Sequence, residues 1–149
     1  MRLLLAAALA TIPAVAIAQD DAQRDALKAR QGYMVAIATN MAPLAAMAQG
    51  QLDYDEETAV FHANNLAALG HYAVEMHFPE GTAQGELEGS QALPAIWGNL
   101  DDVMAKHEKF EEAAAAAPEG VKGGRQQVAA VVQSLGGTCK ACHDDYRAK

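Results

Sequence analysis

The two cysteines of the chain, Cys139 and Cys142, lie three positions apart, and His143 directly follows the second. They stand in the stretch GGTCKACHDDYR, close to the end of the sequence. Residues three and four positions apart lie on one face of an α-helix. Two thiols and an imidazole would therefore point the same way, as a set that can hold a redox-active group or a metal ion.

The pattern C-x-x-C-H is the attachment signature of c-type haem. Two thiols one helical turn apart can each add to one vinyl group of the haem, and the adjacent imidazole then lies under the iron as an axial ligand. We therefore expect Cys139 and Cys142 to bind one haem c covalently and His143 to ligate its iron.

Three alternative interpretations apply to the same residues. One is a structural disulfide between Cys139 and Cys142, and another is a thioredoxin-like redox pair, which belongs beside a βαβ pattern that the sequence lacks. The third is a zinc site, which needs further ligands at converging positions. The remaining histidines are scattered and have no paired spacing: His62, His71, His77 and His107. The haem interpretation is favoured over these three.

Apolar residues at helical spacing predict the elements that position this motif, and no segment has a convincing strand pattern. Three helices are expected at about residues 20–49, from Asp53 or Asp55 to about 78, and 94–117, and a fourth carries the motif from about Arg125 to the end. Pro43 should bend or break the first helix. Four such helices joined by short loops predict an all-α, antiparallel four-helix bundle with up-down-up-down topology.

The first 18 residues have the features of a secretory signal peptide. One arginine precedes an apolar run from Leu3 to Leu9, and Ala16-Ile17-Ala18 has the small-x-small pattern of a cleavage site. A membrane anchor is the alternative, but the segment is short for a span and contains Pro13. We expect cleavage after Ala18 and one exported, periplasmic domain of residues 19–149.

Three short motifs together resemble the class II c-type cytochromes, the group that includes the cytochromes c′. They are Arg30-Gln31, Ile96-Trp97 and the closing GGTCKACHDDYR. The resemblance covers essentially all of residues 19–149 and implies a haem domain on a four-helix bundle. It also implies that Arg30 and Gln31 lie near the haem propionates and that Arg147 lies beside the ligating histidine. From the residues alone, Arg30 and Gln31 form an ordinary solvated helix face.

The resemblance places Met34 on the distal side of the haem. If its sulfur ligates the iron, the haem is six-coordinate and low-spin, and the protein is an electron carrier. If it does not, the haem is five-coordinate and binds small gases such as nitric oxide or carbon monoxide. We expect one-electron transfer through a His143-ligated haem, with gas binding as the alternative, and the residues alone leave the role of Met34 open.

The net charge of the chain limits the classes of partner that it can bind. Cleavage would remove one of the 11 basic residues and none of the 19 acidic ones, which leaves a net charge of −9. Such a surface argues against nucleic acid and against membrane insertion, and it favours a basic redox partner protein. Family members often pair through their first two helices, so the small residues of 42–48 would allow a homodimer.

The other conspicuous side chains have structural interpretations. We expect Tyr33 and Trp97 to pack between helices and His107 to be a hydrogen-bonded core histidine. We expect the pairs Glu56-Glu57 and Glu111-Glu112 to be exposed to solvent, and nothing in the sequence suggests paired-carboxylate catalysis. We therefore do not expect an enzyme.

Overall fold

The computed structural model describes residues 14–149, so that most of the predicted signal peptide lies outside the described part. Its α-helices are α1 (Ala14–Gln49), α2 (Glu56–Gly70), α3 (Leu100–Gly120) and α4 (Arg125–Tyr146). Two short 3-10 helices, η1 (Val74–His77) and η2 (Pro94–Ile96), lie in the long connection between α2 and α3. Each α-helix packs against the next one along the chain, and α4 packs against α1.

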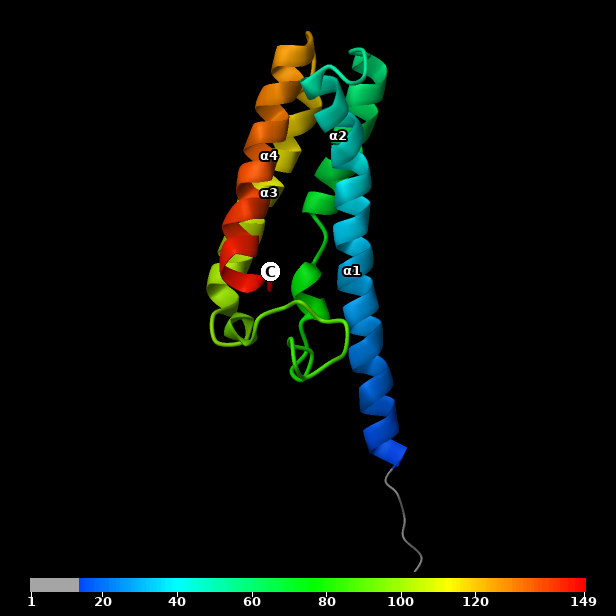
Figure 1. Cartoon of the computed structure of the whole chain (residues 1–149), viewed down its shortest axis with the longest axis vertical. Helices are drawn as coiled ribbons and strands as arrows, with labels where there is room; N and C mark the ends of the chain where they lie inside the picture. The colour runs from blue at the N-terminus through cyan, green and yellow to red at the C-terminus, as the bar shows by residue number, and fades with distance from the viewer. Residues whose placement is uncertain (1–13) are drawn as a thin grey trace, which may run out of the picture.

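Successive α-helices run in opposite directions along one long axis, as Figure 1 shows. No strand is present among residues 14–149. The prediction of an all-α, antiparallel four-helix bundle is therefore confirmed. Within the same residues, no helix is both long enough and apolar enough to cross a membrane.

The second predicted helix is wrong in its extent, because α2 ends at Gly70 and not near residue 78. Gly70 lies against α3, where an added Cβ would come within 3.2 Å of the Glu111 Cα. Glycine permits this close approach and weakens the helix at the same point. The chain then turns, and η1 buries Val74 in the bundle. The predicted start is correct: the Asp55 carboxylate caps α2 by accepting the Thr58 N–H at 2.8 Å.

Two proline-based boundaries also differ. Pro94 begins the 3-10 turn η2, and α3 starts only at Leu100, after Gly98, which is a poor helix former. α1 continues through Pro43, so of the predicted bend or break the break does not occur. Leu44 is fully buried directly after it, so packing of this turn against the bundle outweighs the hydrogen bond that proline removes.

The interior contains two hydrophobic clusters. The main cluster fills the bundle and has at its centre the fully buried Leu44, Leu66, Val128 and Leu135. A smaller cluster of Ile96, Val103 and Tyr146 lies where α4 ends. Cys139 packs against the main cluster and Cys142 against the smaller one. The cysteine pair therefore lies at the junction of the two clusters.

Leu135 tests the assignment of the main cluster. We expect Leu135→Ala to lower the free energy of unfolding by about 3 kcal/mol, because the truncation leaves a cavity in a close-packed interior. Denaturant titration followed by helical circular dichroism measures the change. Leu52→Ala is the matched control, because Leu52 is 48% exposed and its truncation should cost less than about 0.5 kcal/mol. Equal effects in the two variants would contradict the assigned core.

Candidate functional site

The chemistry-bearing residues lie in the last two turns of α4. Cys139, Cys142 and His143 are all half-buried, as expected for a motif on the apolar face of the helix. Both cysteines are free thiols in this structure. No group of three His, Cys, Asp or Glu side chains within the described residues could hold a metal ion, which removes the zinc alternative for this part of the chain.

Burial changes the acid–base properties of the motif. It raises the pKa of both the Cys139 and the Cys142 thiol. It also lowers the pKa of His143, and the positive charge of Arg147 lowers it further. The imidazole is consequently held in its neutral form, which is the form that ligates metals.

A cavity of about 460 Å³ lies between α1, the end of α4 and the connection that follows η1. Most of its wall is apolar, with Leu27, Val35, Phe78, Ile96 and Val103 among the contributors. Cys142 and His143 form part of one wall. This volume is in the range of about 300–1,000 Å³ that is usual for small-molecule and cofactor sites. Two thiols, a neutral imidazole and an apolar cavity beside them fit a covalently attached haem.

Met34 lies on the α1 side of the same cavity. Its side chain is 41% exposed, although it is apolar. The structure thus brings the predicted distal residue and the predicted proximal ligand to one cavity, from helices that are distant in the sequence. Arg30, Gln31 and Arg147 also line it, so that of the predicted site residues only Cys139 lies outside the lining.

Arg30 is deeply buried, with 5% of its surface exposed, and the interpretation of this residue as part of a solvated face is wrong. Its Nη1 donates to Thr82 Oγ1 at 2.9 Å and to the His77 carbonyl at 3.3 Å. Its Nη2 donates to the Thr82 carbonyl at 2.6 Å and to Ser90 Oγ at 2.8 Å. The guanidinium also lies over the Phe78 ring, 5.1 Å from its centroid.

Burial lowers the pKa of Arg30, and no carboxylate of the described residues forms an ion pair with it. Because the four Nη hydrogens all have partners in the protein, only Nε–H is left for a further acceptor. The pairing of Arg30 with a haem propionate stays a prediction, and one N–H is available for it. Gln31 is exposed, and its Nε2 donates to the Gly89 carbonyl at 3.1 Å.

The connection between η1 and η2 is a part of the site that the sequence analysis missed. Its end pairs with the end of α4: Leu93 N–H donates to the Tyr146 carbonyl at 2.9 Å, and Ala148 N–H donates to the Gln91 carbonyl at 2.9 Å. Ala92 and Arg147 form an isolated antiparallel bridge between these two bonds. Three glycines with positive φ mark its turns: Gly81, Gly85 and Gly89. In the sequence, these glycines indicate a loop but do not indicate that the loop belongs to the site.

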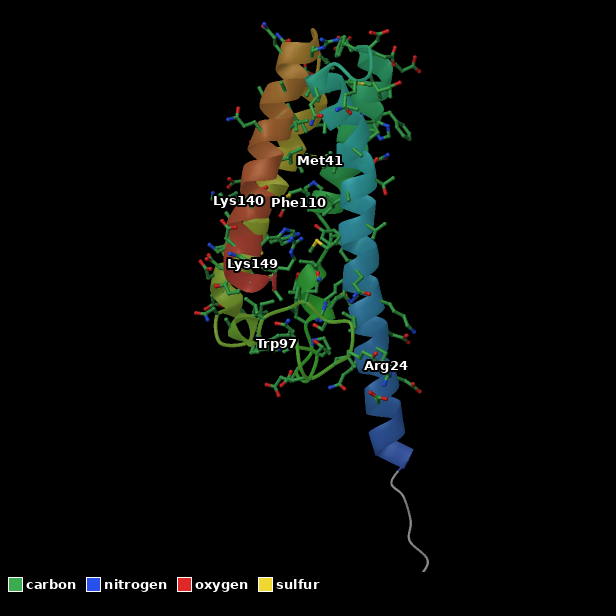
Figure 2. The ribbon with its side chains drawn as sticks, in the orientation of Figure 1. Arg24, Met41, Trp97, Phe110, Lys140 and Lys149 are labelled. Carbon is green, nitrogen blue, oxygen red and sulfur yellow. The ribbon has the colours of Figure 1, made fainter. Side chains whose placement is uncertain are left out.

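The expectations for the surrounding aromatic residues are confirmed. Tyr33 is buried, and its hydroxyl lies 3.0 Å from His107 Nε2, so His107 is a hydrogen-bonded core histidine. Trp97 Nε1 donates to the Phe78 carbonyl at 3.0 Å and packs against the smaller cluster. Figure 2 shows Trp97 at the end of the bundle where the connection crosses, and Lys140 on the outer side of α4.

An antiparallel four-helix bundle whose last helix presents C-x-x-C-H to an apolar, cofactor-sized cavity defines the bundle class of c-type haem proteins. A family model described as Cytochrome C' matches residues 25–147. The cytochrome c′ of Cereibacter sphaeroides is 40% identical over 148 residues, which are 99% of this chain and 98% of that protein. The chain therefore belongs to the cytochrome c′ family.

Solved structures agree with this assignment. Cytochrome c′ from Rhodobacter Spheriodes has a TM-score of 0.82 and 39% identity, covering 85% of this chain and 98% of that one. Cytochrome c prime from Alcaligenes xylosoxidans, solved as a nitric oxide complex of a point variant, has a TM-score of 0.70 and 28% identity. That comparison covers 85% of this chain and 97% of the other. The protein is accordingly a c-type cytochrome with one covalently bound haem c per chain.

The contact between Tyr146 and Asp102 tests how the end of α4 is held. The buried Tyr146 hydroxyl donates to Asp102 Oδ2 at 2.6 Å, and this bond holds the pKa of Asp102 below its usual range. The unfolded chain therefore takes up this proton at a higher pH than the folded one. The stabilisation is complete above about pH 4 and is lost as the pH falls through the lowered folded pKa.

We expect Asp102→Asn to flatten the decrease in the unfolding midpoint below about pH 4. Thermal denaturation at a series of pH values measures the profile. Asp101→Asn is the control, because Asp101 is the neighbouring acidic residue in the first turn of α3 and makes no hydrogen bond to Tyr146. The assignment is contradicted if both variants keep the wild-type profile.

Proposed function

We propose that the protein is a five-coordinate, high-spin cytochrome c′ that binds small gases such as nitric oxide or carbon monoxide. The observation that carries this proposal is the apolar cavity beside His143, whose α1 wall is formed by a half-exposed Met34 side chain. Membership of the cytochrome c′ family supports gas binding better than it supports electron transfer. The nitric oxide complex of the Alcaligenes relative supports the same choice.

In this proposal, residues of α4 hold the cofactor. Cys139 and Cys142 form the two thioether bonds, and the neutral His143 is the proximal ligand. When bound, the haem supplies an iron that changes oxidation state by one electron and takes a diatomic gas on its free face. Arg147 lines the same cavity, and its positive charge adds to the effect of burial in lowering the pKa of His143.

Residues of α1 control access to the free face. Met34 and Val35 line the cavity with uncharged side chains, and Leu27 lies two turns earlier on the same wall. An apolar wall excludes water and favours a small, weakly polar ligand over an anion. The flexible thioether of Met34 then acts as a lid that a gas molecule displaces.

One-electron transfer is the second candidate, because Met34 and His143 border the same cavity and a methionine–histidine pair can hold a haem on both faces. Arg30 and Gln31 also border the cavity, and we propose that they face the haem propionates. Neither function turns over a substrate, so we assign no enzymatic activity.

We further propose that the domain is exported and begins at Gln19. Cleavage after Ala18 would remove only the first residues of α1, well before Arg30. The acidic surface of this domain suits a basic redox partner. Exposed apolar side chains on α1 and α2, Val35 at 63% and Phe61 at 60%, offer a surface for a homodimer.

The spectrum of the reduced protein tests the proposal directly. We expect a broad high-spin spectrum that shifts when carbon monoxide is added, because the distal face carries no protein ligand. Absorbance spectra of protein matured in an exporting bacterial host, with and without carbon monoxide, provide the measurement. Sharp, split bands that ignore carbon monoxide would instead identify the electron carrier.

Met34 has a separate expected effect. Met34→Ala should leave the spectrum high-spin and increase the rate of carbon monoxide combination by about fivefold, because the lid is shortened. Flash photolysis measures this rate. Thr39→Ala is the control, because Thr39 is exposed on the same helix and is not among the residues that line the cavity. A wild-type spectrum that is low-spin and becomes high-spin only in Met34→Ala would show that Met34 is a ligand and not a lid.

A further inference from the structure

The connection between η1 and η2 joins the two walls of the cavity. Figure 1 shows this segment crossing between α1 and the region where α4 ends. On one side, Thr82 and Ser90 of this segment accept three hydrogen bonds of the Arg30 Nη atoms, and His77 at the end of η1 accepts the fourth. On the other side it pairs with the backbone of Tyr146 and the residues that follow.

The acceptors of Arg30 are themselves fixed. Thr82 is fully buried and Ser90 nearly so. Ser90 Oγ donates to the Thr82 carbonyl at 2.8 Å, and Thr82 Oγ1 donates to the Pro79 carbonyl at 2.8 Å. Two hydroxyls that each accept from the guanidinium and donate to a carbonyl have little freedom to rotate. The three side chains form one closed set, which we name the Arg30 clamp.

Arg30, the clamp residue on α1, lies one helical turn before Met34 and on the same side of the helix. Both Arg30 and Met34 line the cavity. Through the connection the clamp is joined to the end of α4, where the Arg147 N–H donates to the His143 carbonyl. Hydrogen bonds, together with the backbone between them, therefore link the turn that precedes Met34 to the turn that carries His143.

We propose that the Arg30 clamp sets the ligation state of the haem by holding Met34 at a fixed separation from the His143 wall. This role of the clamp rests on the proposed function, in which no protein ligand occupies the distal face and a gas can bind there. Met34 gains by burial, because its side chain is apolar and 41% exposed. When the clamp is loosened, α1 can approach, and Met34 then acts as a ligand on the distal face instead of a displaceable lid. Arg30, Thr82 and Ser90 are thus positioning residues for gas binding.

The sharpest test removes one hydroxyl without changing the shape of the side chain. Thr82→Val in the haem-loaded protein should slow carbon monoxide combination by about fivefold, the effect of one lost hydrogen bond on the equilibrium between the two positions of α1. It should also add sharp low-spin bands to the reduced spectrum. Thr82→Ser restores the hydroxyl and should return both readouts to the wild-type values, which a merely structural packing role of Thr82 would not do.

Three further variants make the result decisive. Thr39→Val is the matched control, because Thr39 is exposed on α1 and its hydroxyl bonds only to the Val35 carbonyl. Ser90→Ala replaces Thr82→Val if the latter fails to fold, since it removes a different acceptor of the same clamp. Thr82→Val combined with Met34→Leu should lose the low-spin bands, because the sulfur that produces them is absent.

The outcomes separate the two proposals. A high-spin wild type with slower combination and low-spin bands in Thr82→Val supports both. A high-spin wild type with unchanged or faster combination in Thr82→Val and Ser90→Ala overturns the clamp alone. A low-spin wild type that ignores carbon monoxide overturns the proposed function, and the role of the clamp in keeping the face free is lost with it.

Discussion

The cavity depends on the hydrogen bonds of the buried Arg30 guanidinium. A cation taken out of water is costly unless its donors find partners. Here the partners are neutral oxygens of one loop, with no carboxylate among the described residues in ion-pair range. The one guanidinium group of Arg30 takes acceptors from both His77 and Ser90. Its hydrogen bonds therefore also determine the course of the chain between these two residues. A wall of the cavity is therefore built by an electrostatic requirement and not by apolar packing alone.

The two hydrophobic clusters explain why the wall needs such a device. The main cluster holds the helices together along the bundle, whereas the smaller cluster holds only the end of α4 against α3 and η2. The cavity lies beside this smaller cluster, whose residues Ile96, Val103 and Tyr146 also line it. With less apolar contact available there, polar contacts such as Tyr146 to Asp102 carry a larger share of the local stability.

Local patterns predicted most of the fold and the motif, whereas contacts between distant segments did not appear in them. The four helices follow from apolar periodicity, and the role expected of Cys139, Cys142 and His143 follows from spacing on one helix. Thr82 and Ser90 are ordinary loop residues in the sequence, and their burial depends on an arginine more than 50 positions away. The early end of α2 has the same origin, because Gly70 is required by contact with α3.

The role of Met34 was open in the sequence for a related reason. A methionine side chain is long and flexible, so its reach alone allows both ligation and avoidance of an iron on the neighbouring helix. The choice between them depends on how far apart α1 and the end of α4 are held, which is a property of the tertiary structure. In our proposal, the segment joining Arg30 to Tyr146 sets that separation. In the proposed site, Met34 would therefore be positioned by residues that need not touch the iron.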